Sequence, residues 1–465
     1  MKTVSPLKLG LAHAVGRLSR GSGRGGGTSL PGKLLLRMQS DAISVLASDL
    51  RHGAIVISAT NGKTTTASLL SSILESSDFR PVHNHAGANM AGGIATALLD
   101  ASHDGRVDGD IGLFEVDEAW TQTIVDEINP RVIVLANLFR DQLDRYGELE
   151  TLADGWQKMI GALPSTTSVV LNADDPLLAG IAGGRANTVF FGIEDDRYAE
   201  PVPRHAADSK YCRRCGAALA YSAVQLGHLG KYACPNCEFE RPRPSVAAQS
   251  ISMNGMRGSS IEIVTPTGSF KAEVPIPGLY NVYNAVAAAA AAHALEISSV
   301  ATAAGLASAK AVFGRVETIE IKGHDVALLL IKNPTGANEV LRTITADGDQ
   351  FDLWIALNDN IADGRDVSWV WDADFEMLAD HIRFVTCSGT RAEEMALRLA
   401  YAGIERERIR VDRDVEGSFD TSVSGSIRGE SRLYALPTYT ALLELRGAIS
   451  RRGDAPTYWE QTKLR

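Results

Sequence analysis

The residues that best fit a chemical role form the segment Thr60-Asn61-Gly62-Lys63-Thr64-Thr65, which lies between a short apolar run and a helical pattern. A strand, a tight turn and a helix direct backbone N–H groups and the positive end of the helix dipole at an anion. Gly62 lets the backbone approach a phosphate, Lys63 can reach the β- and γ-phosphates, and Thr64 can offer its hydroxyl to Mg²⁺. The segment therefore predicts a nucleotide-binding loop rather than a chance helix cap, although Ile57 stands where the strict pattern has its first glycine.

Glu115 is a candidate metal ligand because it lies near the end of the apolar run Ile111 to Val116, which has strand length. The carboxyl ends of strands in open α/β sheets face the ligand crevice. Phosphoryl transfer needs metal ions to offset the charge on the phosphate oxygens, and a carboxylate at this place could hold one. The alternative is a solvated acidic turn.

Four of the five cysteines form two CxxC pairs, Cys212 with Cys215 and Cys234 with Cys237, separated by 18 residues. This spacing is typical of a Cys₄ zinc ribbon, in which four thiolates close the tetrahedral shell. We therefore expect a structural Zn²⁺ that contributes to local folding. A redox dithiol is the weaker alternative, because neither pair has a thioredoxin-like βαβ setting. The fifth, Cys387, reads as a buried cysteine at the end of a strand.

The segment from Ala356 to Trp369 is unusually polar for the end of a strand, and it contains Asp366. Three Asp and two Asn lie within nine of its residues, 358–366. On composition alone, a solvated loop explains the segment nearly as well as a functional site does.

The hydrophobic pattern shows which elements must position these residues. Short apolar runs of strand length alternate with helical stretches, which favours a parallel sheet covered on both faces. The expected strands are Ala54 to Ser58, Ile111 to Val116, Val132 to Ala136, Ser168 to Leu171 and Thr188 to Phe191, and the expected helices include Thr64 to Glu75 and Met90 to Asp100.

A second α/β region follows an alanine-rich helical stretch at 285–294. Its expected strands are Leu353 to Leu357, Ile382 to Thr386 and Arg432 to Leu436, and a hinge is expected near Phe313-Gly314-Arg315. We therefore predict an ATP-binding α/β domain at 41–312 with the zinc ribbon inserted at about 205–245, and a Rossmann-like α/β domain at 313–465.

Residues 1–40 form a basic N-terminal arm, which contains seven of the 46 basic residues and none of the 56 acidic ones. Such an arm on an acidic body could meet an anionic lipid surface or a diphosphate. The alternative is a solvated, partly flexible tail, with residues 21–32 as a Gly-rich connector.

Composition narrows the class of protein. The net charge of -10 argues against a general nucleic-acid binder, which would need a basic footprint. No apolar run approaches the length of a membrane span, and no signal-peptide pattern opens the chain. The paired cysteines indicate a reducing compartment, so we expect a cytoplasmic protein.

Several motifs together resemble those of the Mur ligase family, ATP-dependent ligases of peptidoglycan and folate metabolism. The matching segments are Thr60 to Thr65, Asn137 to Arg145, Leu171 to Pro176 and Gly278 to Ala285. The resemblance implies that Glu115 and Thr64 hold Mg²⁺ and that Asn281 approaches the nucleotide. It also implies that Arg315 touches the phosphates from the domain hinge.

The chain departs from this family at some positions. Ala59 replaces a usual Gly, Tyr280 replaces a His, and Gln142 replaces a metal-binding His, which leaves the second metal ion open. The ribose-binding Asp expected just before Lys332 is absent, and only some 40 residues precede the core where the family has a domain that grips a UDP-sugar.

The zinc insertion and the Asp366 segment narrow the resemblance to the ligase subunits of lipid II isoglutaminyl synthases. The resemblance implies ATP-dependent amidation of the second-position D-glutamate of lipid II, at the inner face of the cell membrane. It further implies ammonia from a GatD-like glutaminase partner, whose Cys–His pair Asp366 would complete as the orienting third member. The residues agree with a partner, because no glutamine-hydrolysing site is apparent in this chain.

Two rival functions stay open at this point. One is a Mur-type ligase that adds an amino acid rather than ammonia. The other is a zinc-ribbon NTPase with a nucleic-acid-binding or regulatory role.

Overall fold

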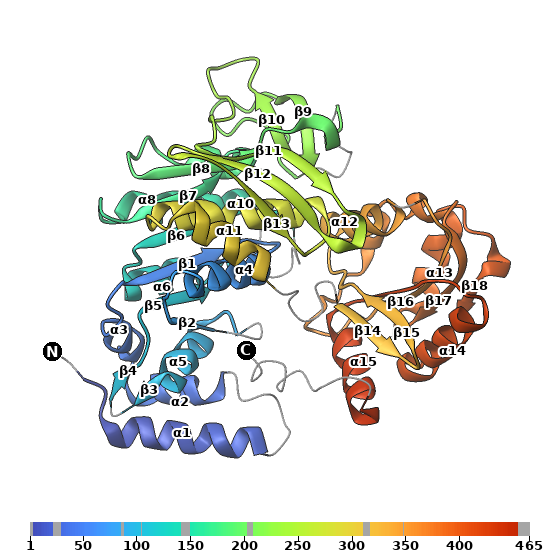
Figure 1. Cartoon of the computed structure of the whole chain (residues 1–465), viewed down its shortest axis with the longest axis horizontal. Helices are drawn as coiled ribbons and strands as arrows, with labels where there is room; N and C mark the ends of the chain where they lie inside the picture. The colour runs from blue at the N-terminus through green and yellow to red at the C-terminus, as the bar shows by residue number, and fades with distance from the viewer. Residues whose placement is uncertain are drawn as a thin grey trace.

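The computed structural model describes residues 3–21, 29–84, 88–103, 105–140, 149–201, 208–309, 317–346 and 348–453. Two sheets with helices packed against them form two adjacent bodies, and the chain passes from the first body to the second after residue 309 (Figure 1).

The first sheet has nine strands in the order β13-β12-β11-β8-β7-β6-β1-β5-β2. Neighbours from β2 to β11 pair in parallel, whereas β11, β12 and β13 pair in antiparallel fashion. The sequence predicted a parallel sheet, and the parallel part therefore carries an antiparallel extension at one edge. The strands are β1 Ala54–Ser58, β2 Pro81–His83, β5 Ile111–Glu115, β6 Val132–Leu135, β7 Ser168–Asn172, β8 Thr188–Ile193, β11 Val246–Met253, β12 Ser259–Thr265 and β13 Gly268–Val274.

Both faces of this sheet are covered, which explains its uninterrupted apolar strands. Along β1, Ile55 and Ile57 face a cluster that includes α4, while Val56 faces a cluster that includes α5. The first face carries α4 Lys63–Glu75, α10 Leu279–Ala294 and α11 Ser299–Ser308, and the second carries α3 Ala42–Ala47, α5 Ala91–Asp100, α6 Thr121–Ile128, α8 Leu149–Ala162 and α9 Pro176–Ile181.

The N-terminal arm is helical. Helix α1 (Pro6–Gly21) packs on α2 (Leu30–Met38), which packs on α5, and the three lie at the lower edge of the first body (Figure 1). Val4, Leu9 and Ala12 are buried in the same cluster as the α5 side chains. The prediction of a solvated tail is therefore wrong for residues 3–19, because the apolar side of α1 packs against the hydrophobic core of the first body.

The second sheet has the order β14-β15-β19-β16-β17-β18. Its strands are β14 Glu317–Ile321, β15 His324–Leu328, β16 Phe351–Ala356, β17 Ile382–Ser388, β18 Ile409–Val411 and β19 Leu433–Pro437, and its helices are α12 Pro334–Thr345, α13 Ala392–Tyr401, α14 Val415–Arg428 and α15 Tyr439–Arg452. All pairs except the β14–β15 hairpin are parallel. Among the described residues no helix is both long and apolar enough to cross a bilayer.

Candidate functional site: a phosphate loop beside a buried carboxylate

The predicted phosphate loop connects β1 to α4, as its sequence setting required. Gly62 has φ of +83°, a left-handed conformation in which an L side chain is strained. A Cβ on Gly62 would also lie 2.0 Å from Asn284 Oδ1. The N-cap residue of α4 is Gly62, which has no side chain to cap the first turn, so the first N–H groups of the helix are directed at the space where an anion would bind.

Asn137, which follows β6, holds the loop in this shape. Its side chain accepts from the N–H of Asn61 and donates to the carbonyl of Asn61, both at 2.9 Å. Thr60 contributes a further bond, because its hydroxyl accepts from the N–H of Phe139 at 3.1 Å. The Asn61 Nδ2 group is buried and has no hydrogen-bond acceptor within the described residues. A buried donor without an acceptor fits a loop that is completed by a phosphate oxygen.

The structure brings three of the predicted residues together at the start of α4. Thr64 Oγ1 donates to Glu115 Oε1 at 2.8 Å. Lys63 Nζ lies 2.6 Å from Glu118 Oε2, and both residues of this pair are buried. A hydroxyl beside a carboxylate oxygen is a suitable ligand set for Mg²⁺, which prefers oxygen donors. The residues present therefore fit a nucleotide phosphate with its magnesium ion.

Glu118 was not identified as a site residue from the sequence, yet it determines the charge of the site. Burial alone lowers the pKa of Lys63, but attraction to Glu118, with smaller contributions from Glu115 and Asp117, raises it overall. Lys63 is therefore held as a buried cation in the absence of any phosphate.

Glu115 is itself positioned by Asn84, a residue that the sequence did not single out. Asn84 Oδ1 accepts from the N–H of Glu115 at 2.9 Å, and Asn84 Nδ2 donates to the carbonyls of Glu115 and Ala88. The backbone that carries the candidate metal ligand is thus tied to the segment that leads into α5.

The second body reaches the phosphate loop through the residues that precede α12. Asn333 Nδ2 donates to Asn61 Oδ1 at 3.0 Å while Asn333 Oδ1 caps α12 by accepting from Gly336 N. Lys332 Nζ donates to the carbonyl of Thr60 at 3.3 Å. A loop expected to bind nucleotide is therefore bonded from both bodies.

Two other predicted contacts have different outcomes. Asn281 lies near the start of α10, buried, where it donates to the Pro277 carbonyl and accepts from Asn284. Its role at the nucleotide remains a prediction. Arg315 and the departure at Gln142 lie outside the described residues.

The four paired cysteines converge at the base of the hairpin formed by β9 (Ala220–Leu226) and β10 (Leu229–Ala233), which stands beyond β8 and β11 (Figure 1). Their sulfur atoms lie within 4.8 Å of one another, with Sγ–Sγ distances of 3.6 Å for Cys212–Cys237 and 3.4 Å for Cys215–Cys234. Zn–S bonds of about 2.3 Å in a tetrahedron place sulfur atoms about 3.8 Å apart. The cluster therefore fits a tetrahedral zinc ion.

The turn of this hairpin packs against the loop that holds the phosphate loop. The ring of His228 lies 4.6 Å from the ring of Phe139, and its Nε2 lies 3.5 Å from Asp175 Oδ1. Asp175 in turn accepts from the N–H of Leu138. Asp175, within the segment 172–176, thus connects the turn of the β9–β10 hairpin to the residues that follow β6.

Asp366 lies in the polar loop after β16, and its side chain is exposed. It accepts from the N–H of Ser368 at 2.8 Å, which lowers the pKa of its carboxyl group. The other two aspartates of the loop have structural partners: Asp359 binds Arg391, and Asp363 accepts from the backbone N–H of Thr440. Asp366 is thus the carboxylate of this loop that is presented outward.

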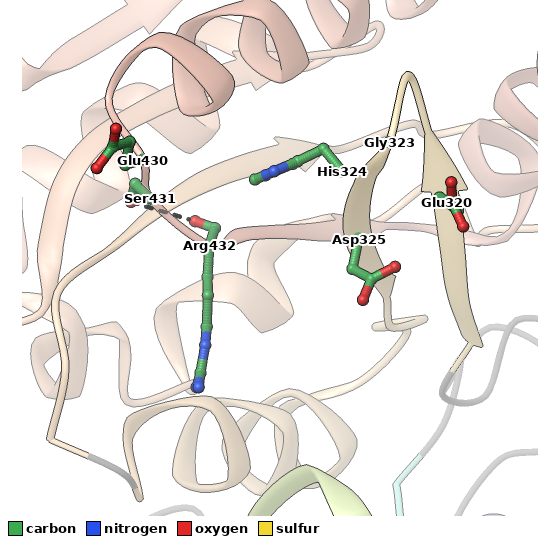
Figure 2. Close-up of a pocket in the computed structure, with 7 residues that line it drawn as sticks. All are labelled: Glu320, Gly323, His324, Asp325, Glu430, Ser431 and Arg432. Atoms are coloured by element: carbon green, nitrogen blue, oxygen red, sulfur yellow. Dashed lines mark hydrogen bonds between the residues drawn. The ribbon is translucent and has the colours of Figure 1, made fainter.

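A cavity of about 600 Å³ lies elsewhere, at the β14–β15 turn. Figure 2 shows the side chains of His324 and Arg432 beside it, at the amino ends of β15 and β19. Ligands of open α/β sheets bind at the carboxyl ends of strands, so this polar cavity is not the candidate site.

Comparison with known proteins matches each of the two bodies to a domain of Mur ligase-type proteins. Residues 57–237 match the Mur ligase middle domain, and residues 330–442 match the MurT ligase C-terminal domain. The MurT subunit of the glutamine-hydrolyzing lipid II isoglutaminyl synthase of Streptococcus pneumoniae is 34% identical over 435 residues, 92% of this chain and 93% of that protein.

Solved structures of low sequence identity share the fold. A pseudomurein peptide ligase type C from Methanothermus fervidus has a TM-score of 0.67 at 23% identity, over 87% of this chain and 79% of that one. A folylpolyglutamate synthase from Mycobacterium tuberculosis, complexed with ADP and AMPPCP, has a TM-score of 0.60 at 16% identity, over 90% and 95%. With the relative from Streptococcus and the two domain matches, the motif resemblance is confirmed: the chain belongs to the MurT family of Mur ligase-type synthase subunits.

Proposed function

We propose that the chain is the ATP-dependent ligase subunit of a lipid II isoglutaminyl synthase, which converts the α-carboxylate of D-glutamate in the stem peptide to D-isoglutamine. The observation that carries this proposal is the buried Lys63 beside the Thr64–Glu115 pair, in a chain that resembles a named MurT subunit along nearly its whole length. The rival amino-acid ligase is supported less far along the chain: the UDP-N-acetylmuramoylalanine--D-glutamate ligase of Geobacter metallireducens is 35% identical over 152 residues, 32% of this chain.

The chemistry has two steps. An oxygen of the substrate carboxylate attacks the γ-phosphorus of ATP, which gives an acyl phosphate and ADP. The nitrogen of ammonia then attacks the carbonyl carbon, and phosphate and a proton leave. Lys63 and the N–H groups of α4 would stabilise the negative charge of the transferring group. Mg²⁺, held by Thr64 and Glu115, would supply further positive charge at the phosphates.

A partner subunit supplies the ammonia in this proposal. The relatives are named as one subunit of a glutamine-hydrolyzing synthase, which implies a second subunit. Asp366 is exposed, and large apolar side chains are exposed on the adjoining elements, including Trp371 and Tyr401, whose rings are 5.6 Å apart. Exposed aromatic residues are frequent anchors of protein interfaces. The partner is a GatD-like glutaminase, and Asp366 orients its catalytic histidine.

The proposal also assigns the cofactors of the enzyme and its location in the cell. ATP and Mg²⁺ occupy the phosphate loop, and Zn²⁺ occupies the four-cysteine cluster as a structural ion. The enzyme works in the cytoplasm, peripherally at the inner face of the cell membrane, because lipid II is a membrane-bound substrate.

The test is amidation by the chain co-purified with its glutaminase partner. Lipid II, ATP and glutamine with an isotope-labelled amide nitrogen are incubated, and the stem peptide is analysed by mass spectrometry. Transfer of the label to D-glutamate is expected, and free ammonia should replace glutamine. Addition of an amino acid instead, or ATP turnover that depends on DNA or RNA, would overturn the proposal.

A further inference from the structure

We infer that the outer face of α1 is a docking surface for an anionic lipid bilayer. This inference deepens the proposed function, because a lipid-linked substrate requires the enzyme to work at a membrane. It rests on the arrangement of apolar and basic side chains around α1, which the catalytic proposal does not use.

The outer face of α1 presents an unbroken apolar stripe. Leu7, Leu11 and Leu18 are 83%, 53% and 74% exposed, and Ala14 between them is also exposed. At 3.6 residues per turn, positions 7, 11, 14 and 18 fall within an arc of about 60°. Leu9 and Ala12, which are buried, point to the opposite side, against the protein core. The stripe is therefore not left over from packing of the arm onto the body.

Basic residues flank the stripe. Lys8 and Arg17 lie about 80–100° to either side of its centre on the same helical geometry. Arg17 is exposed, and Lys8 is half-buried, with its Nζ donating to Gln39 Oε1 at 3.3 Å. Lys33 and Arg37 on α2 are also exposed, and residues 1–40 contain no Asp or Glu. An apolar stripe bordered by cations on an otherwise acidic protein is the pattern of helices that lie in the interface of anionic membranes.

A second copy of this chain is a poorer occupant of the surface. A two-fold interface centred on α1 would bring the same basic flanks against each other, which repel. An anionic bilayer instead complements both the leucines and the cations.

The docking helix is connected to the catalytic site by close packing. A Cβ on Gly32 of α2 would lie 2.0 Å from the carbonyl oxygen of Gly92 in α5, and Gly32 N donates to Thr96 Oγ1. The segment before α5 is bonded to the Glu115 strand through Asn84. A bilayer bound at α1 would thus hold the phosphate-loop site at a fixed position relative to the membrane surface.

The test is sedimentation of the full-length chain with vesicles of phosphatidylglycerol and phosphatidylcholine, against vesicles of phosphatidylcholine alone. The double variant L7E/L18E should reduce binding to the anionic vesicles at least tenfold. The variant R17Q/K33Q should reduce it about fivefold for each charge removed, with an effect that falls as salt rises. Val300→Glu, at a residue 79% exposed on α11, is the matched control and should bind as the wild type does.

Activity separates this inference from the proposed function. All variants should amidate a water-soluble, short-chain lipid II analogue at the wild-type rate, whereas L7E/L18E should be slow on lipid II embedded in vesicles. The docking surface would be overturned if the wild-type chain did not bind anionic vesicles, or if the L7E/L18E variant bound them as the wild type does. A wild-type dimer in light scattering that L7E/L18E dissociates would also overturn it. If the wild-type chain, with its glutaminase partner, failed to amidate the soluble analogue, the proposed function would be overturned instead.

Discussion

The phosphate-loop site and the Asp366 loop both follow strands that pair in parallel with their neighbours, yet their candidate residues are held in opposite ways. Lys63 is buried and paired with Glu118, and the loop before it is bonded by Asn137, which follows β6, and by Asn333 of the second body. Asp366 is exposed and accepts a hydrogen bond from a neighbour two residues away. The first site has its charges balanced within the chain, and the second presents a charge outward. We interpret the difference as that between a site complete in one subunit and a site that a partner completes.

Asp366→Asn is expected to have the largest effect, and it tests whether a partner completes the Asp366 site. If Asp366 orients the partner's histidine, glutamine-driven amidation should fall by as much as about 10⁴-fold, because the amide supports the wrong tautomer. Amidation driven by free ammonia should be unchanged. Steady-state rates with the two nitrogen donors measure this split. Asp372→Asn, at another exposed aspartate of the same region, is the control, and equal loss of both activities would contradict the assigned role.

Lys63→Met should lower amidation with either nitrogen donor by about 100- to 1000-fold, the usual cost of one positioned charge at a transferring group. Glutamine hydrolysis, which the proposed partner would carry out, should persist to a greater extent than amidation. The measurement is the rate of ADP release in the presence of lipid II. Lys271→Met, at an exposed residue of β13, should retain activity. Retention of activity by the Lys63 variant would show that the buried site is not the phosphate site.

Glu118→Gln should destabilise the nucleotide-free chain by up to about 3–5 kcal/mol, because it leaves the buried Lys63 without its partner. ATP should restore much of this loss, since its phosphates offer replacement charge and ligands stabilise the state that they bind. Thermal unfolding with and without ATP and Mg²⁺ measures the difference. An ATP-induced rise in Tm no larger than that of the wild type would show that Lys63 does not exchange Glu118 for phosphate.

His228→Asn is expected to have the smallest effect, a decrease of about 1 kcal/mol in the free energy of unfolding. Burial alone lowers the pKa of His228, but attraction to Asp175 outweighs it and raises the pKa overall. The charged pair therefore contributes stability that is fully present below about pH 6.5, the unfolded value, and is lost as pH rises through the folded pKa.

The wild type should accordingly be more stable than the His228→Asn variant at low pH, and the difference in Tm should shrink as pH rises. Both proteins contain the same four paired cysteines, so the comparison separates the effect of the histidine from any effect of metal binding. A difference that grows with pH would contradict this account.

How far the sequence predicts the site depends on the range of the interactions. Gly62, Lys63 and Thr64 are adjacent in the chain, so the local strand–turn–helix pattern placed them together. Glu115 was placed by the end of an apolar strand, and the four cysteines by their spacing. Glu118, Asn84 and Asn333 were not predicted as partners, because nothing local distinguishes them from ordinary polar residues. Their contacts join positions 31 to 272 residues apart.

The fold shows the same limit. The largely apolar strands β1, β5, β6 and β7 were predicted nearly to the residue, since burial on both faces leaves a nearly continuous apolar run. The antiparallel strands β12 and β13 were not predicted, because their alternating and partly exposed residues give a weaker pattern. The N-terminal arm looked flexible, because the core that buries Leu9 is made by α2 and α5.

The sequence by itself therefore determined the family resemblance and the candidate residues: a predicted phosphate loop, a nearby carboxylate and four cysteines with metal-ligand spacing. Each of these depends on residues that are close in the chain or on a continuous apolar run. The tertiary structure alone decided the charge balance of Lys63, the bonding of the phosphate loop by Asn333, and the exposed leucine stripe on α1. These features depend on which distant surfaces meet and which remain uncovered, and that is settled only when the whole chain is packed.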